Sequence, residues 1–340
     1  MNNYSKARRA GVVGFRGYSG AELVRLLAHH RQVEPVLLEH RKDFEERPKP
    51  ANARQPARVA FSPGAVKSEN LEVVFLATPA EVSMELAPEL LATGVKVIDL
   101  SGAFRFSDPA EYSRWYKEPH TAPGLLGEAV YGLPEFCRRR IAGARLIANP
   151  GCYPTAANLA LQPLVASGVI ERSAGIVCDA KSGVSGAGRK VTLKTSFCEV
   201  TDNFSAYSVL DHRHVPEILA VSKLAESDLS FTAHLLPIDR GILETIYFRA
   251  RNISSAAGLM AIYSERYRNE PFVRLYEPGT LPDIRGVDRT NFCDIGVRFD
   301  AATGRAVVVS AIDNLVKGAA GQAIQNMNLM LGFEETEGLL

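Results

Sequence analysis

The 340-residue sequence has little charge for its length and no excess of either sign. Lys and Arg number 39 and Asp and Glu 38, which leaves a formal net charge of +1. This balance removes the electrostatic reason to expect a protein that binds nucleic acid or an anionic membrane. Hydrophobic residues make up 46% of the chain, enough for a large core, and the length suggests two domains.

The sequence also lacks long hydrophobic runs and paired cysteines. No uninterrupted apolar segment reaches the length of a membrane helix, and the stretch 10–14 is too short for a secretory signal. The cysteines are odd in number, widely spaced and form no CxxC pair, so neither a disulfide framework nor a metal site is indicated. A reducing cytoplasm is the expected location. The five cysteines are Cys137, Cys152, Cys178, Cys198 and Cys293.

Short apolar runs alternate with helical patterns over the first 100 residues. This alternation predicts βαβ units and a mostly parallel sheet. The segment 41–60 is rich in charge and proline and is predicted to be an exposed excursion. Strands are expected at 10–13, 33–38, 73–76 and 95–100, and helices at 21–29 and 82–91.

The pattern changes after about residue 175. The later strand-like runs are rich in β-branched residues and favour a half-covered, mixed sheet. The strong helical pattern at 319–331 is expected to return to the first domain. The sequence therefore predicts an α/β protein: a first domain at 1–150, completed by a C-terminal helix within 314–340, and an α+β domain at 151–313.

A glycine-rich turn lies between the first strand and the first helix. Glycines there permit a tight turn in which backbone amides and the helix dipole meet a diphosphate. The spacing GxxGxxG departs from the commonest fingerprint, and a tight turn without a ligand would also use glycine. Because the turn opens a βαβ unit, we predict a Rossmann-type dinucleotide-binding domain. The predicted cofactor-binding residues of this turn are Gly14, Arg16, Gly17, Tyr18, Ser19 and Gly20.

The end of the second strand indicates which dinucleotide binds. An acidic residue there holds the ribose hydroxyls of NAD, whereas the extra phosphate of NADP needs positive charge. Here Glu39 is followed by His40, Arg41 and Lys42. A solvated basic turn is the alternative, but with Arg16 in the glycine turn the cluster favours NADP(H), and Arg41 is predicted to contact it.

Cys152 is the candidate nucleophile. The strand-like run 144–148 is followed by Asn149-Pro150-Gly151-Cys152 and then by the helical run 156–165. A thiol near a helix N-terminus has a lowered pKa, which favours the thiolate. Asn149 and the loop amides could polarise a carbonyl oxygen. A lone cysteine is usually inert, and for the other four cysteines we expect that outcome.

His212 and His214 are the candidate proton-transfer and substrate-binding residues. They flank Arg213 just before Pro216, which is placed to open a helix. Histidine is the usual partner of a cysteine nucleophile, although a surface or capping role is the common alternative.

A second glycine-rich loop, 181–190, follows the predicted strand 176–180. It lacks the Gly-Lys-Ser/Thr order of a P-loop, so a triphosphatase is not indicated. Ser182 and Gly183 in this loop are predicted cofactor contacts, with a mobile surface loop as the alternative. Arg105 and Arg240 are candidate anion clamps that spacing cannot distinguish from surface arginines.

Taken together, these segments closely resemble the N-acetyl-γ-glutamyl-phosphate reductase family, which is related to aspartate-semialdehyde dehydrogenase. The cysteine loop and the loop 181–189 are its most specific motifs, and the glycine turn alone would be weak. The matching segments are 17–23, 131–135, 149–155, 181–189, 212–218, 234–237, 240–243 and 313–322.

The resemblance implies NADPH-dependent reduction of an acyl phosphate to an aldehyde through a Cys152 thioester. It implies that His212 is the acid/base and that His214 binds substrate, in an order that stays open. It also implies that Arg105 binds an anion and that Asn314 approaches the nicotinamide. The second domain becomes the substrate and dimerisation domain, and a homodimer or homotetramer is expected, without nucleic-acid or membrane partners.

Two departures from the family pattern stand out. Ala103 replaces the aspartate usual before Arg105, and Phe15-Arg16 stands where small residues are usual. Two other functions remain open from the sequence. One is the equivalent reductase of lysine biosynthesis, acting on an aminoadipyl phosphate attached to a carrier protein. The other is a nucleotide-binding regulator without catalysis.

Overall fold

The structure is a computed structural model that describes residues 7–40 and 55–340. The chain forms two compact units: unit 1 comprises Met1–Pro150 and Ala319–Leu340, and unit 2 comprises Gly151–Gly318. The predicted return of the chain at residue 314 thus lies five residues before the return in the structure. Within the described ranges, none of the helices has the length and hydropathy needed to span a membrane.

Unit 1 is built on a seven-stranded parallel sheet with the order β3-β2-β1-β4-β5-β7-β6. Its central strands are nearly continuous apolar runs, as expected where helices cover both faces. The strands are β1 (Arg8–Val13), β2 (Val33–Glu39), β3 (Ala57–Ala60), β4 (Leu71–Leu76), β5 (Lys96–Asp99), β6 (Val130–Tyr131) and β7 (Leu146–Ala148).

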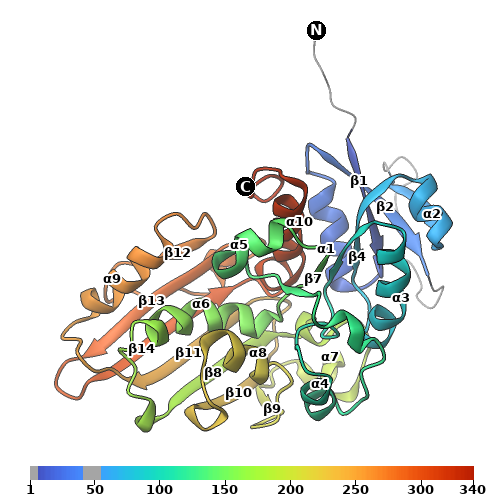
Figure 1. The fold of residues 1–340 in the computed structure, drawn as a ribbon. Coiled ribbons are helices and arrows are strands. Elements are labelled where there is room, and N and C mark those ends of the chain that lie inside the picture. Colours follow the sequence, from blue (N-terminus) through green and yellow to red (C-terminus); the bar gives the residue numbers. More distant parts are fainter. Residues whose placement is uncertain (1–6, 41–54) are drawn as a thin grey trace. The chain divides into compact units, whose positions relative to one another are not determined.

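Helices lie on both faces of this sheet, with α1, α5 and α10 on one face and α2 and α3 on the other (Figure 1). Helix α1 buries Leu23, Leu26 and Leu27, whose spacing of three and four residues places them on one side. The helices are α1 (Tyr18–Leu27), α2 (Pro63–Ser68), α3 (Ala80–Ala92), α4 (Pro109–Tyr116), α5 (Pro134–Ala142) and α10 (Gly321–Leu331).

Unit 2 is built on a seven-stranded mixed sheet with the order β12-β13-β14-β11-β8-β10-β9. Only the pairs β8–β10 and β12–β13 are parallel. The strands are β8 (Ile176–Gly183), β9 (Ser205–Tyr207), β10 (Leu229–Leu236), β11 (Ile242–Arg249), β12 (Val273–Leu275), β13 (Cys293–Asp300) and β14 (Arg305–Ile312).

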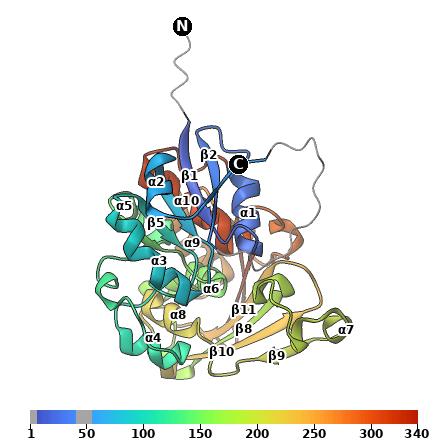
Figure 2. The ribbon, with the colours of Figure 1, turned by 90° about the vertical axis from the view of Figure 1, so that its right-hand side faces the viewer.

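One face of this second sheet is covered by helices. Helix α6 packs on β11 and β14, α8 lies beside α6, and α9 packs on β12 and β13. The short helix α7 lies away from α6 and α8, beyond β8 and β10 (Figure 2). Burial alternates along β11, the pattern expected of a strand with one covered and one exposed face. The helices are α6 (Cys152–Ala166), α7 (Phe197–Val200), α8 (Val215–Ser222) and α9 (Ala256–Tyr267).

The predicted fold class is confirmed: a Rossmann-type parallel sheet and a second mixed sheet. The structure corrects the prediction in two places. Of the predicted excursion 41–60, residues 41–54 lie outside the described residues, and Ala57–Ala60 form strand β3, which pairs with β2. The expected helix 319–331 begins instead as a π-helix, Val316–Ala320, before α10.

Candidate active site

The glycine turn of unit 1 has the close packing that a dinucleotide site requires. Gly14 has a φ of +78°, and a Cβ there would lie 2.2 Å from the Ala77 carbonyl oxygen. A Cβ on Gly20 would lie 2.3 Å from the Gly14 carbonyl oxygen. Only glycine fits at either position, so the first turn of α1, which holds Tyr18 and Ser19, lies against the end of β1. The turn fits a diphosphate on the amides of α1.

At the end of β2, Glu39 holds two arginines. Arg16 Nη2 and Arg58 Nη2 each donate to Glu39 Oε1 at 2.6 Å, and Arg58 Nε donates to Oε2 at 3.2 Å. These hydrogen bonds lower the pKa of Glu39 to about 2, the Arg58 contact more than the Arg16 contact. Arg41, predicted to contact the cofactor, lies outside the described residues.

Arg105 is oriented by backbone carbonyls in unit 1. Its Nε donates to the Asn149 oxygen at 2.8 Å and its Nη2 to the Leu100 oxygen at 3.1 Å. Ala103, in place of the usual aspartate, is fully buried and leaves these two contacts intact. The Asn149 side chain is engaged at both ends, donating to the Ala319 oxygen and accepting from Asn326. To polarise a carbonyl oxygen of the substrate, the side-chain amide of Asn149 would have to give up its hydrogen bond to the Ala319 oxygen.

In unit 2, Cys152 is the first residue of α6. Gly151 forms the N-cap in an extended conformation, and its N–H donates to Glu217 Oε2 at 2.9 Å. A Cβ on Gly318 would lie 2.7 Å from Cys152 Cβ, so the chain just before the unit boundary packs directly against the cysteine. The amides at the start of α6 favour a negative charge on its first side chain.

His212 is buried among aromatic rings, with ring centroids of Tyr153, Tyr207 and Phe231 within 5.6 Å. Burial, and then the neighbouring Arg213 charge, lower the pKa of His212 from 6.5 to about 4. Its Nδ1 accepts the His214 N–H at 3.2 Å. The ring is therefore neutral at pH 7, with its proton on Nε2, from which it can donate a hydrogen bond.

His214 and Glu217 lie beside the N-cap of α6. A Cβ on Gly151 would be 2.8 Å from His214 Nε2 and 2.9 Å from Glu217 Oε1, so any larger residue at 151 would displace both. The two histidine rings are 4.9 Å apart. Unit 2 thus brings together the predicted Cys152 segment and both predicted histidines.

Two tyrosines complete this group. Tyr153 and Tyr207 share a hydrogen bond of 3.2 Å between their hydroxyls. Burial is the main cause that raises the pKa of both, that of Tyr207 to about 12, and the Cys152 charge raises both further. The tyrosines therefore stay protonated and supply neutral hydroxyls near the cysteine.

The second glycine loop meets the predicted residues Arg240 and Asn314. Gly183 N–H donates to the Gly241 oxygen, Gly241 N–H donates to Asn314 Oδ1 at 2.7 Å, and Asn314 Nδ2 donates to Ser185 Oγ at 3.0 Å. Ser182 is buried and donates to the Gly183 oxygen. The structure thus joins Ser182, Gly183, Arg240 and Asn314 in one cluster.

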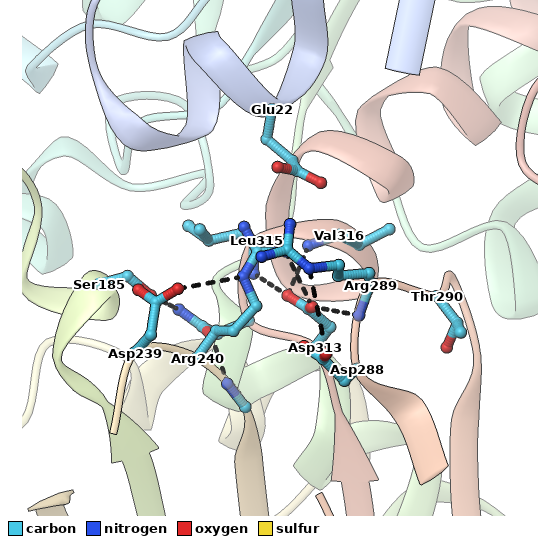
Figure 3. A network of polar contacts seen from close by, with 12 residues as sticks. Glu22, Ser185, Asp239, Arg240, Asp288, Arg289, Thr290, Asp313, Leu315 and Val316 are labelled. Atoms are coloured by element: carbon cyan, nitrogen blue, oxygen red, sulfur yellow. Dashed lines mark hydrogen bonds and ion pairs between the residues drawn. The ribbon is translucent and has the colours of Figure 1, made fainter. Parts of the chain in front are cut away.

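Asp313 fixes this cluster (Figure 3). Its Oδ2 accepts from Arg240 Nη1 at 3.1 Å and from the Arg289 N–H at 2.7 Å, and its Oδ1 accepts from the Leu315 and Val316 N–H groups. Burial raises the pKa of Asp313 against these contacts. Arg240, predicted as a substrate contact, is thus bonded to a fully buried carboxylate.

Sequence reasoning did not single out Glu217, Tyr207, Asp313 or Arg58. Glu217 could have been found, because His214 and Glu217 are three residues apart and such residues share a helix face. The other three depend on tertiary contacts. In the described part of the chain no group of His, Cys, Asp and Glu could hold a metal ion.

The arrangement is suited to covalent catalysis by a thiolate beside a neutral imidazole donor, in a chain whose other unit has a dinucleotide turn. The family model of the semialdehyde dehydrogenase NAD-binding domain matches residues 9–144, and that of the semialdehyde dehydrogenase dimerisation domain matches residues 152–314. The fold and the matches define an enzyme of the semialdehyde dehydrogenase class.

Curated relatives narrow this class. An N-acetyl-gamma-glutamyl-phosphate reductase of Desulforudis audaxviator is 50% identical, covering 98% of both chains, and one of Symbiobacterium thermophilum is 49% identical, covering 98% of this chain and 97% of the relative. The chain belongs to the N-acetyl-gamma-glutamyl-phosphate reductase family, which confirms the resemblance stated from the sequence.

Solved structures show the same fold at low identity. Aspartate semialdehyde dehydrogenase II from Vibrio cholerae, complexed with ASA, superposes with a TM-score of 0.71 at 18% identity, covering 96% of this chain and 99% of that one. Aspartate semialdehyde dehydrogenase with NADP from Candida albicans superposes with a TM-score of 0.70 at 16% identity, with the same coverage.

Proposed function

We propose that the chain reduces N-acetyl-γ-glutamyl phosphate to N-acetylglutamate semialdehyde and phosphate, a step of arginine biosynthesis, through a thioester on Cys152. The observation that carries this proposal is the position of Cys152 as the first residue of α6, beside two buried histidines. The names of the relatives at 45–50% identity supply the substrate.

The chain's own groups account for the acyl transfer. The Cys152 thiolate, favoured by the amides of α6, attacks the acyl carbon, and the carbon–oxygen bond to phosphate breaks. The leaving phosphate takes up one proton from solvent, while the neutral His212 ring donates a hydrogen bond from Nε2 to the departing oxygen. The thioester that remains accepts hydride more readily than a carboxylate.

NADPH, when bound, supplies the hydride that converts the thioester to the aldehyde and releases the thiolate. The residues of the glycine turn, Gly14 to Gly20, would hold its diphosphate, since only glycine at both ends lets the turn pack this tightly between β1 and the N-terminal amides of α1. Ser182, Gly183 and Asn314 form a polar cluster in unit 2 to which we assign the other cofactor contacts.

Arg105, His214 and Arg240 are assigned to the acyl phosphate substrate. Arg105 and Arg240 each carry a charge that a phosphate or carboxylate can share, and both are oriented by fixed oxygen atoms. His214 lies against Gly151, one residue from the nucleophile.

We infer that the protein forms a homo-oligomer and that a second copy binds the face of the unit 2 sheet opposite α6. The match to a dimerisation domain over residues 152–314 supports this assignment. So do Val177 and Tyr247, which are each 45% exposed on that face.

The cytoplasm is the proposed location, in keeping with five free thiols.

The test is phosphate-dependent oxidation of N-acetylglutamate semialdehyde with NADP⁺, run beside the aminoadipate analogue. We expect activity with the first substrate alone. Cys152→Ala is expected to lose at least about 1,000-fold in kcat while NADP⁺ binding, measured by calorimetry, persists.

Cys198→Ala is the matched control, because Cys198 is an exposed cysteine of the same unit. It should retain wild-type kcat. Turnover by Cys152→Ala would remove the thioester mechanism, and activity only with the aminoadipate analogue would remove the proposed substrate.

A further inference from the structure

The two arginines bound to Glu39 come from different parts of unit 1. Arg16 lies in the glycine turn, Glu39 ends β2, and Arg58 lies on β3, the neighbouring parallel strand. Arg58 binds the carboxylate with two nitrogen atoms, Nε and Nη2, and Arg16 with one. Such two-point binding fixes the plane of a guanidinium group.

Phe15 provides a surface under both guanidinium groups. The Arg16 guanidinium carbon lies 4.6 Å from the centre of the Phe15 ring, and that of Arg58 lies 5.5 Å from it. The Phe15 ring is buried, so it does not move freely. Phe15, Arg16, Glu39 and Arg58 therefore form one assembly, the Glu39 cluster, beside the glycine turn.

The charge of the Glu39 cluster discriminates between the two nicotinamide dinucleotides. Glu39 Oε1 accepts from both guanidinium groups and Oε2 accepts from Arg58, so a ribose hydroxyl would compete with the arginines for this carboxylate, unlike in an NAD site. Two arginines and one carboxylate leave one positive charge. This charge favours a phosphate monoester over a neutral hydroxyl.

We propose that Arg16 and Arg58, held in place by Glu39, bind the 2′-phosphate of NADP, and that Arg58 on β3 is a specificity-determining residue. This inference rests on the proposed function, which requires NADPH. Glu39 acts here as a positioning residue for the two arginines. The unusual pair Phe15-Arg16 in the glycine turn then has a role in cofactor selection.

The experiment measures binding of two adenosine fragments by calorimetry, 2′,5′-ADP and 5′-AMP, which differ only in the 2′-phosphate. Wild type should bind 2′,5′-ADP more tightly. Arg58→Ala should weaken 2′,5′-ADP about tenfold, the size expected for one charge-assisted hydrogen bond. Binding of 5′-AMP should not weaken, because Glu39 then regains an oxygen for the ribose.

Arg58→Lys keeps the charge but not the two-point contact and should recover part of the 2′,5′-ADP affinity. Arg8→Ala is the matched control, since Arg8 has a similar exposure (39% against 38%) and pairs with Glu72 at the other end of the same sheet. It should leave both fragments unaffected.

If Arg58→Ala weakens the binding of both fragments equally, Arg58 only stabilises the pairing of β2 with β3, and the inference is overturned. So would equal affinities of the two fragments for wild type. If wild type turns over with NADPH in either case, only this inference fails. If wild type neither turns over with NADPH nor binds either fragment, the proposed function itself fails.

Discussion

His212 shows how one residue's surroundings set its chemistry. A histidine in water would be partly charged near neutral pH, but the aromatic rings around His212 exclude the water that would stabilise the cation. The His214 N–H then fixes the neutral tautomer. The same burial makes the folded state sensitive to acid.

We predict that stability falls as pH drops from 6.5 to 4. The folded-state pKa of about 4 lies below the unfolded value of 6.5, so between these values the unfolded chain binds more protons. Full protonation would cost up to about 3 kcal/mol. Urea unfolding of wild type and His212→Gln at several pH values should give a shallower decline for the variant. Parallel curves would contradict the environment assigned to His212.

Individual site residues differ in how far the sequence predicts them. The proposal for Cys152 could be made because its strand–loop–helix context is local, and a local pattern is enough to place a thiol at a helix N-terminus. By contrast, Arg105 bonds to Asn149, 44 residues away, and Glu39 bonds to Arg58 and Arg16, 19 and 23 residues away. Their contacts depend on strand order, which the sequence does not contain in readable form.

At the scale of elements, β11 carries an unusual residue under α6. Glu244 is fully buried on the helix-covered face of the sheet, and its Oε2 accepts from Cys178 Sγ at 3.7 Å. Its Oε1 has no hydrogen-bond partner in the part of the chain that the structure describes. Burial raises the pKa of Glu244 well above its usual value, so the side chain is held as the neutral acid.

We predict that Glu244→Gln is more stable than wild type at pH 8 and about equal to it at pH 4. The unfolded glutamate releases its proton above pH 4.5, whereas the folded one retains it. The free energy of unfolding of wild type therefore falls by about 1.4 kcal/mol for each pH unit above 4.5, until the pH reaches the pKa of Glu244 in the folded state. Urea unfolding at both pH values checks this. Glu265→Gln, at an exposed position on α9, should show no such trend.

A constant difference in the free energy of unfolding between Glu244→Gln and wild type at all pH values would show that Glu244 is not held as the neutral acid.

Elements like β11 were predictable because alternating apolar residues mark a half-covered strand. The π-helix Val316–Ala320 was not, since its start is set by Asp313 and by the packing of Gly318 on Cys152. Strand β3 was missed because its exposed residues, Arg58 among them, resemble a loop.

At the scale of the whole molecule, unit 2 has two apolar surfaces that are candidates for the proposed contact with a second copy. One is the uncovered sheet face, where Val177, Tyr247 and Val307 line a groove of 510 Å³. The other is the segment around α7, where Leu193 and Phe197 are more than 75% exposed. The sheet face is formed by regular strands, which two copies can match over a wide, flat area.

Tyr247→Glu is therefore expected to convert the proposed oligomer to a smaller species in sedimentation velocity, because it places a charge on the sheet face. Leu193→Glu places the same charge on the other apolar surface and serves as the control. It should sediment as wild type does. The reverse pattern, with dissociation by Leu193→Glu alone, would move the interface to the α7 segment. If both variants dissociate, the two surfaces belong to one interface. A contact between the segment around α7 and the second sheet fits that outcome, because Phe204 packs on His234 of β10 with 4.9 Å between the ring centroids.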